Sequence, residues 1–596
     1  MKRIFFLILI VNLTLLSAMS KKQDPNAVDD WEYNATSVMK DTTRQMPTMY
    51  GNIKSSAPMA MTMPSPVARK SIGLAVGGAK DSNNFKANIE NGYLPKLDSI
   101  TYEGQFYNHY FDTGLQGECK ELFCPSYSSA KRVNKFSGEE EYFLSVGLNS
   151  GIKEGDFKRK KLNLVVVVDI SGSMSSKFNS YYYDKIGNKI ENKEEESKSK
   201  MTIANESIVA MLSHLKDNDR VGVVLFDHNA YRAKPLREVG KTDKEAIRNH
   251  ILALKSKGGT NWSAGYKEGV KLFDDISKNS EYENRIIFLT DAMPNRGEMN
   301  KGKLFGMAKD ASTKGIHTTF IGIGVDFNND LVEYVSKTKG ANYFSVHSSK
   351  EFARLLDKDF NYMVTPLVYD LELKLSDSSY IIEAVYGSPQ ANLSTGDIMR
   401  VNTLFPSHND GKATKGGVIL VKLKKDAEMA RDKKLTLDIT YKDTNGKSYS
   451  NSQKVEFKRK NSYYDNSGIE KAILVSDYVS VMKNWLIDAR AACNDKVSWV
   501  NQQPIEIQKR CMLYPPMHPD FPKVATWERR PCKLKVSSGY KKLFYLFKKY
   551  YIDEMKVLKD DSLKKELNVI NLLLNSIRET SNVYRNAPRD DWMYGK

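Results

Sequence analysis

The feature that most restricts the fold of this 596-residue chain is a set of four short apolar runs that alternate with stretches of helical periodicity. The runs lie at residues 162–168, 220–226, 285–289 and 318–324, and the helical stretches at residues 202–215, 244–254, 263–276, 301–313, 329–337 and 349–362. A continuous β-branched run such as residues 162–168 is typical of a strand that is buried on both faces of a parallel sheet. Strands that alternate with helices of this length are joined by right-handed crossovers. The sequence therefore predicts an α/β domain at residues 161–363, with a doubly wound, mostly parallel sheet.

Residues on both sides of this domain have the pattern of strands with one buried face. The alternating or apolar runs are residues 141–148, 371–375, 401–405, 418–423, 435–441 and 455–457. Asn445 and Gly446 lie between the last two runs and favour a tight hairpin turn. We therefore expect an antiparallel β-sandwich made of residues 84–160 and 364–460, with the α/β domain inserted in it or flanked by it.

The N-terminus has the three-part pattern of a secretory signal peptide. Lys2 and Arg3 precede an apolar run at residues 4–16, and residues 18–20 supply a small-x-small cleavage site. An uncleaved anchor is disfavoured because the run is short for a bilayer span, which needs about 20 residues. We therefore expect a signal peptide at residues 1–20 and no transmembrane span after its cleavage. The protein is expected to be secreted, periplasmic or held at the cell surface.

Two further regions differ from both domains in composition. Residues 21–83 are rich in Met, Pro and Ser without sustained periodicity, which predicts a flexible linker. Residues 466–596 return to helical periodicity and predict a C-terminal helical region. The chain has a formal net charge of +18, which is compatible with nucleic acid or an acidic surface as partner. Residues 533–549 mix Lys with aromatic residues, but their helical spacing and the expected export favour a solvated amphipathic helix, so no nucleic-acid partner is expected.

Five cysteines are too few for a disulfide scaffold, but an oxidising compartment gives them a use. Cys119 and Cys124 lie close together in the sequence and are candidates for a disulfide that closes a small loop. Cys493, Cys511 and Cys532 leave one cysteine unpaired whichever two of them join, and their pairing stays open. A zinc site is disfavoured because the chain has no CxxC motif and no histidines at ligand spacing.

Oxygen-bearing side chains follow the predicted buried strands at their carboxyl ends. Asp169, Ser171 and Ser173 come directly after the first strand, Thr260 follows a pair of glycines, and Asp291 ends a later strand. Ligands of a doubly wound sheet bind at this edge, and hard cations prefer oxygen ligands. In the alternative interpretation Ser171 merely caps the following helix, but this leaves Thr260 and Asp291 unexplained.

This pattern resembles the metal-ion-dependent adhesion site of von Willebrand factor A domains, and the resemblance covers residues 161 to about 362. It implies that Ser171, Ser173 and Thr260 ligate a divalent cation directly, while Asp169 and Asp291 hold its waters or bind it themselves. The cation most compatible with the resemblance is Mg²⁺, with Mn²⁺ and Ca²⁺ as alternatives. An exposed Asp or Glu of a protein partner would complete the coordination shell.

The segments that flank the domain are similar to a group of exported bacterial proteins in which an A domain lies inside flanking β structure. Some proteins of this group carry the label "calcium-activated chloride channel homologue". We reject a channel here, because the chain has no span that could line a pore. The polar stretch at residues 177–200 departs from the pattern, since it is inserted between the metal loop and the first helix, where it could shade or extend the metal face.

These expectations together favour an exported, non-enzymatic protein-binding module for adhesion or assembly, whose contact depends on the metal. One alternative is a hydrolase in which the metal activates water. None of the eight histidines belongs to an HExxH motif, and no general base stands beside the metal motif in the sequence. The other alternative is a protein that binds acidic polymers through a basic surface.

Overall fold

The computed structural model describes most of the chain between residues 70 and 576, and a short segment before it. The described residues are 27–34, 70–80, 83–176, 181–183, 189–191, 198–276, 281–291, 297–298, 300–323, 338–346, 349–376, 380–388, 398–425, 435–495 and 533–576. The predicted signal peptide, the predicted helix at residues 329–337, most of the inserted stretch at residues 177–200, Cys511 and Cys532 lie outside them.

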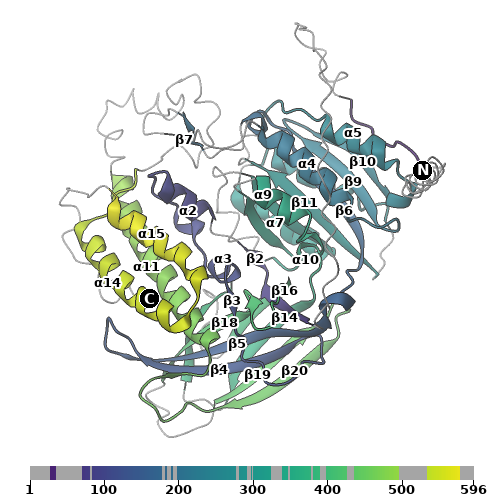
Figure 1. The fold of residues 1–596 in the computed structure, drawn as a ribbon. Coiled ribbons are helices and arrows are strands. Elements are labelled where there is room, and N and C mark those ends of the chain that lie inside the picture. The colour runs from purple at the N-terminus through teal and green to yellow at the C-terminus, as the bar shows by residue number, and fades with distance from the viewer. Residues whose placement is uncertain are drawn as a thin grey trace, which may run out of the picture.

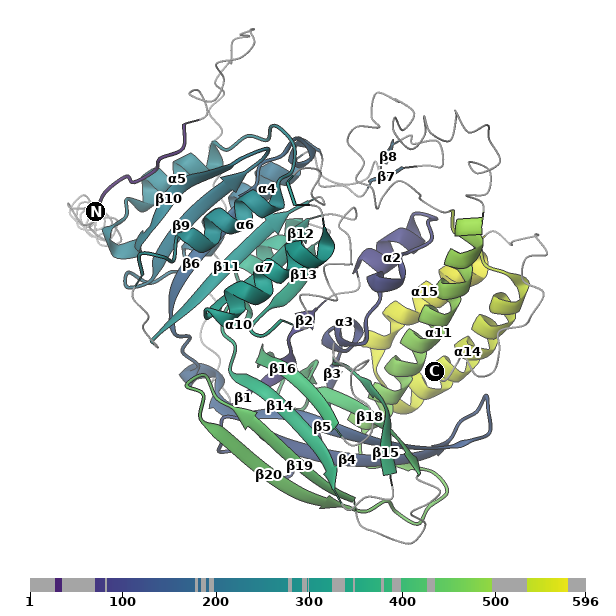
Figure 2. The same cartoon turned by 180° about the vertical axis from the view of Figure 1, so that it is seen from behind.

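The α/β domain is built on a seven-stranded sheet with the strand order β10-β9-β6-β11-β12-β13-β2 (Figures 1 and 2). Its strands are β2 Gly78–Ala79, β6 Lys161–Asp169, β9 Arg220–Phe226, β10 Ala230–Glu238, β11 Tyr282–Thr290, β12 Ile316–Ile323 and β13 Asn342–Val346. All neighbours are parallel except β10, which is antiparallel to β9. The four strands expected from the apolar runs are confirmed. β10 was not expected, because this edge strand is only partly buried and carries charged residues.

Helices cover both faces of this sheet (Figures 1 and 2). They are α4 Lys200–Leu212, α5 Lys244–Leu252, α6 Trp262–Lys271, α7 Lys301–Thr313, α9 Ser349–Leu356 and α10 Phe360–Met363. On β6, Val166 and Val168 belong to the same core as α4, α5 and α9, whereas Val165 and Val167 pack with α6 and α7. The unbroken apolar run of β6 follows from this burial on two faces.

The flanking segments form one antiparallel sheet of ten strands, with the order β15-β18-β5-β1-β16-β14-β19-β20; β4 also pairs with β5, and β21 pairs with β4. The strands are β1 Ser71–Val76, β4 Cys124–Val133, β5 Glu140–Lys153, β14 Val368–Ser376, β15 Tyr380–Tyr386, β16 Ile398–Ser407, β18 Val418–Lys425, β19 Leu435–Lys442, β20 Ser448–Val455 and β21 Tyr463–Tyr464. β5 pairs with β18, and β1 pairs with β16. Strands from before and after the α/β domain therefore share one sheet, as the insertion predicts.

The arrangement of this sheet differs from the expected sandwich of two separate sheets. The 14-residue strand β5 pairs with β18 along residues 142–147 and with β1 at Asn149 and Lys153, so it joins two halves of one continuous sheet. Apolar side chains from both halves meet in a single core, for example Leu144, Leu373 and Ile419. Alternation in the sequence identifies a buried face but does not say which strands are neighbours, which is why the connection was missed.

The prediction of a linker over residues 21–83 is wrong for two segments. β1 is a buried central strand, and β2 directly after it pairs with β13, so this segment connects the two large sheets. Residues 27–34 lie against the edge strand β10, where Glu32 N donates to Ala233 O at 2.7 Å. Asp30 also forms a buried ion pair with Lys234 at 3.1 Å. The short run of β1 was obscured by the Met- and Pro-rich residues that precede it.

A helical layer packs on the antiparallel sheet (Figure 2). It contains α11 Ser467–Asp495, α14 Ser538–Leu558 and α15 Lys564–Asn575, so the described part of the predicted C-terminal helical region is helical. Two short helices from the segment before the α/β domain join the same core: α2 Asn83–Glu90 and α3 Tyr102–Tyr107. Among the helices of the described residues, none has the length and apolar character needed to cross a membrane.

Two small two-stranded sheets and a single helical turn lie between these larger elements. β3 Tyr110–Phe111 pairs with β17 Thr414–Lys415, and β7 Tyr181–Tyr183 pairs with β8 Lys189–Glu191 within the inserted stretch. The 3-10 turn η3 Gly172–Ser175 follows β6 and carries the centre of the candidate site.

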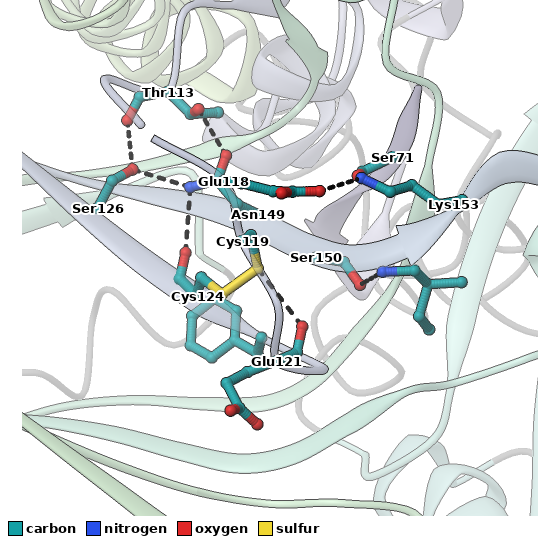
Figure 3. Close-up of a disulfide and its surroundings, with 12 residues drawn as sticks. Ser71, Thr113, Glu118, Cys119, Glu121, Cys124, Ser126, Asn149, Ser150 and Lys153 are labelled. Atoms are coloured by element: carbon teal, nitrogen blue, oxygen red, sulfur yellow. Dashed lines mark hydrogen bonds and ion pairs between the residues drawn. A yellow bond between two sulfur atoms is a disulfide. The ribbon is translucent and has the colours of Figure 1, made fainter. Parts of the chain in front are cut away.

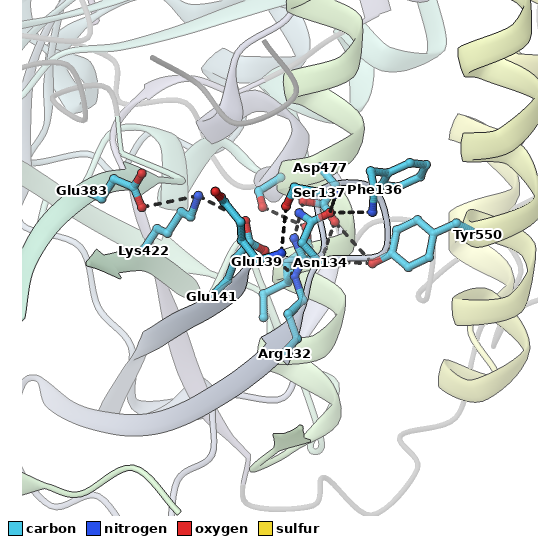
Figure 4. A network of polar contacts seen from close by, with 12 residues as sticks. Arg132, Asn134, Phe136, Ser137, Glu139, Glu141, Glu383, Lys422, Asp477 and Tyr550 are labelled. Carbon is cyan, nitrogen blue, oxygen red and sulfur yellow. Dashed lines mark hydrogen bonds and ion pairs between the residues drawn. The ribbon is translucent and has the colours of Figure 1, made fainter. Parts of the chain in front are cut away.

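A buried polar network connects the helical layer to the sheet (Figure 4). Arg132 of β4 donates through Nε to Glu141 at 2.6 Å and through both terminal nitrogens to Asp477 of α11 at 2.7 and 2.9 Å. The Arg132 guanidinium also donates to the Tyr550 hydroxyl of α14 at 3.1 Å, and Lys422 of β18 pairs with Glu141 at 3.1 Å. Burial raises the pKa of Asp477, although Arg132 acts in the opposite direction. One side chain of the sheet is thus bonded to both long helices.

Cys119 and Cys124 form a disulfide with a Cα–Cα distance of 5.8 Å (Figure 3). The small loop that it closes lies against β5, where Gly151 N donates to Glu121 O at 2.8 Å. On the strand side, Asn149 Nδ2 donates to Cys124 O at 3.1 Å and to Ser126 Oγ at 2.9 Å. The disulfide therefore ties a surface loop to the first residue of β4, and hydrogen bonds hold that loop against β5.

Removing this disulfide should lower stability only moderately, because the closed loop is short. The loop-entropy relation gives about 2 kcal/mol for a loop of this size. We expect the double variant Cys119→Ser/Cys124→Ser to melt a few degrees below the wild type under oxidising conditions. A reductant should lower the melting temperature of the wild type to that of the variant and leave the variant unchanged. A wild type that does not respond to the reductant would contradict the assignment.

Candidate metal-binding site

Two aspartates lie together at the carboxyl ends of neighbouring parallel strands. Asp169 is the last residue of β6, Asp291 follows β11, and Val168 is paired with Leu289 in the register of these strands. Both carboxylates are buried, with 0% and 1% of the residue exposed. Between them, Thr290 Oγ1 donates to Asp169 Oδ2 at 2.6 Å. The parallel register thus brings together two acids that are far apart in the sequence.

The loop after β6 links these acids through two serine hydroxyls. Asp169 Oδ1 accepts from Ser171 N at 2.8 Å, which turns the loop back over the strand end. The hydroxyls of Ser171 and Ser173 lie 3.0 Å apart, and Ser173 Oγ donates to Asp291 Oδ1 at 2.7 Å. Ser171 stands at the N-cap of η3 but makes no side-chain cap hydrogen bond, so its hydroxyl does not serve as a helix cap. Four of the five predicted ligands therefore lie in one chain of polar contacts.

The loop of Thr260 lies directly beside this chain. Gly172 N donates to Gly258 O at 2.9 Å, and Asn261 N donates to Asp227 O at 2.8 Å, so backbone hydrogen bonds hold the loop at both ends. Gly258 has a φ of +74°, and a Cβ there would approach the side chain of Asp227 to 3.1 Å. Thr260 itself is 2% exposed. The second glycine-rich loop is thus shaped by backbone contacts that place Thr260 next to the first loop.

Three residues at the site were not among the predicted ones. Thr290 bridges to Asp169 as described, and Trp262 Nε1 of α6 donates to Thr290 Oγ1 at 3.2 Å. Lys200, the first residue of α4, forms an ion pair with Asp291 Oδ2 at 3.0 Å, with only 1% of its side chain exposed. One signal could have identified Lys200. The positive end of the helix dipole makes a lysine in the first turn of a helix unfavourable. A lysine at that position, if it is buried, therefore needs an acidic partner.

The two carboxylates of the site, Asp169 and Asp291, lie close together and are shielded from solvent. Burial and, secondarily, the neighbouring carboxylate of Asp291 raise the pKa of Asp169 above its ordinary value. Within the part of the chain that the structure describes, no group of three or more His, Cys, Asp or Glu residues could hold a metal. The oxygens that could hold an ion at this edge are serine hydroxyls together with the two carboxylates. Such a mixed oxygen set fits a hard divalent cation.

The site reaches solvent on the side of its two loops. Asp169, Ser171 and Thr260 are buried, whereas Ser173 is half-buried and Gly172 and Gly258 are exposed. His228 lies at the Thr260 loop, where its Nδ1 accepts from Gly259 N at 2.9 Å. This histidine nitrogen is therefore already engaged by the backbone. The arrangement can bind a cation from the protein side and leave its outer side to another molecule.

Part of the chain is similar in sequence to known proteins. Residues 164–294 match the family model of the von Willebrand factor type A domain. Mouse inter-alpha-trypsin inhibitor heavy chain H2 is 23% identical over 222 residues, which cover 36% of this chain and 21% of that protein. An uncharacterised protein of Synechocystis is 25% identical over 221 residues, which cover 36% of this chain and 46% of that protein. The chain thus matches only about a fifth of the length of the inhibitor heavy chain.

Solved structures that align with part of this chain include a von Willebrand factor type A protein from Catenulispora acidiphila. It aligns with a TM-score of 0.40 and 13% identity over 65% of this chain and 84% of that chain. The ArnB paralog VWA2 from Sulfolobus acidocaldarius aligns with a TM-score of 0.33 and 12% identity, over 76% of this chain and 97% of that chain.

Proposed function

Because this chain contains a von Willebrand factor A domain, matched at residues 164–294, we propose that it is an exported protein-binding module for adhesion or assembly, gated by a divalent cation. Domains of this family are typically protein-interaction or adhesion modules. The observation that carries the metal dependence is the chain of oxygens that runs from Ser171 through Ser173 to Asp291 beside the buried Asp169. Export rests on the signal-peptide pattern at residues 1–20.

The proposed roles follow from the position of each side chain. Ser171, Ser173 and Thr260 would bind Mg²⁺ directly, and Asp169 and Asp291 would hold its waters or bind it themselves. Neutral hydroxyl ligands leave most of the positive charge on the ion, and the half-buried Ser173 marks the side open to solvent. An Asp or Glu of a partner can then complete the coordination shell from that side. The contact would form only when the cation is bound.

No enzymatic activity is part of this proposal. Domains of this family and inter-alpha-trypsin inhibitor heavy chains are generally non-enzymatic. A hydrolase would need a base beside the metal, and His228 Nδ1 already accepts from the backbone N–H of Gly259. The binding function therefore has the stronger support.

The first test is the response of the purified full chain to Mg²⁺. A cation that binds the folded state stabilises it by mass action, by about 2.7 kcal/mol at a concentration of 100 times Kd. We expect Mg²⁺ to raise the melting temperature of the α/β domain relative to EDTA, and Asp169→Ala to abolish this rise. Ser175→Ala is the matched control, because its hydroxyl bonds to Gly172 O in the same loop and faces none of the proposed ligands. An equal response of wild type and Asp169→Ala would refute the metal site.

A second measurement examines the contact itself. The full chain is immobilised and exposed to the native extract in Mg²⁺ or EDTA, with Asp169→Ala and Thr260→Ala as variants. A specific partner should be retained by the wild type in Mg²⁺ and lost both in EDTA and in the two variants. A partner that is retained under all conditions would exclude the metal-gated contact and point to another surface.

A further inference from the structure

Lys200 places a fixed positive charge against one of the proposed metal ligands. Its ammonium lies 3.0 Å from Asp291 Oδ2, and the side chains of the two residues are 1% and 0% exposed. The other oxygen of the same carboxylate, Oδ1, accepts from Ser173. Asp291 is therefore shared between the serine chain of the site and an internal cation.

The backbone holds Lys200 in this position. Its N–H donates to Ser176 O at 2.9 Å, which ties the first turn of α4 to the end of the η3 loop. The preceding residue, Ser199, caps the helix by accepting from Thr202 N at 3.1 Å. The lysine thus stands directly behind the metal loop, where the helix dipole disfavours a cation. Burial of an ammonium at this end of a helix is unfavourable unless a nearby anion compensates it, and Asp291 supplies that anion.

The charges of the site indicate how the ion pair of Lys200 and Asp291 affects cation binding. Two ionised carboxylates, Asp169 and Asp291, would repel each other strongly in a buried site without a cation. The ammonium of Lys200 offsets one of them in the metal-free protein. When a divalent cation enters, the same ammonium repels it and competes with it for Asp291.

We propose that Lys200 is a built-in counter-cation of the metal site, which stabilises the metal-free protein and lowers the affinity of the site for divalent cations. This inference rests on the proposed metal dependence of the domain. It makes the contact responsive to the free concentration of the cation, because a weakened site is filled only when the metal is abundant. The same positive charge remains beside the loaded site and strengthens its attraction for a carboxylate of the partner.

The test is a titration of the full chain with Mg²⁺, followed by melting temperature and by calorimetry. Lys200→Met and Lys200→Gln remove the charge, and Lys200→Arg keeps it. Lys198→Met is the matched control, because Lys198 lies two residues away in an exposed pair with Glu206. The neutral variants should bind Mg²⁺ roughly tenfold more tightly than the wild type, or more, and melt at a lower temperature in EDTA. Lys200→Arg and Lys198→Met should bind it like the wild type.

The outcomes separate this inference from the proposed function. A wild type and neutral variants that bind Mg²⁺ equally, or neutral variants that bind it more weakly, would overturn the role of Lys200 and leave the metal site intact. A wild type without a response and neutral variants with one would support the role of Lys200 and refute metal gating in the natural protein. No response in any of the proteins would overturn both. Two neutral side chains are used so that a folding defect of one does not decide the result.

Discussion

Replacing Asp219 by Ala is expected to destabilise the α/β domain by about 3–5 kcal/mol, because it leaves a buried guanidinium without its carboxylate. Asp219 accepts from Arg159 NH1 at 2.9 Å and forms an ion pair with Arg159 NH2 at 2.5 Å. The side chains of the two residues are only 0% and 2% exposed. The same carboxylate accepts from Leu162 N at 2.8 Å and from Lys216 N at 2.6 Å. One side chain therefore holds the start of β6 and the loop that leads into β9.

Amide hydrogen exchange is the measurement that resolves this effect within a chain of several domains. The protected amides of β6 and β9 should exchange about a hundredfold faster or more in Asp219→Ala. Asp217→Ala is the control, because Asp217 is exposed and pairs with the exposed Lys244, so its loss should cost less than about 1 kcal/mol. Similar exchange in the two variants would contradict the prediction. The ion pair of Asp219 and Arg159 lies at the amino ends of β6 and β9, whereas the proposed metal site lies at the carboxyl end of β6. The Mg²⁺ response should therefore persist in Asp219→Ala.

Replacing Arg132 by Met is expected to loosen the helical layer from the antiparallel sheet, also at a cost of about 3–5 kcal/mol. The guanidinium is the common partner of Asp477, Glu141 and Tyr550 (Figure 4). Glu141 keeps its ion pair with Lys422 after the substitution, but the carboxylate of Asp477 loses both of its hydrogen bonds from Arg132. Because burial already raises the pKa of Asp477, the ionised form should become less favourable still.

Hydrogen exchange in α11 and the melting temperature report this effect. The double variant Arg132→Met/Asp477→Leu removes the stranded charge and should recover at least about half of the lost stability, since apolar replacement of a buried pair is often neutral. Lys135→Met is the control on the same hairpin, because the side chain of Lys135 is 63% exposed and its pair with Glu554 is long, at 3.5 Å. A double variant that is less stable than Arg132→Met would show that the cost comes from packing and not from the stranded carboxylate.

The α/β domain could be predicted from the sequence because its signals are local. A strand buried on two faces must be apolar at consecutive positions, and Val165–Val168 of β6 meets this requirement on both faces. The meeting of the candidate ligands could be predicted for the same reason, since parallel neighbours end at one edge and residues after β6 and β11 must meet there. The antiparallel sheet was predicted only in part, because alternation shows a buried face but not the neighbour.

By itself, the sequence determined the α/β architecture, the strands that end at the candidate site, the hairpin at Asn445 and Gly446, and the helical character of the described part of the C-terminal region. Periodicity and turn chemistry act over a few residues, so they can be read without the fold. Only the tertiary structure decided that β5 joins two groups of strands into one antiparallel sheet and that residues 70–80 connect this sheet to the parallel one. It alone also decided that Lys200 forms an ion pair with Asp291. The last contact spans 91 positions and that of Arg132 with Asp477 spans 345. Such contacts depend on how distant elements pack, and burial selects the partner of a charged side chain only once that packing exists.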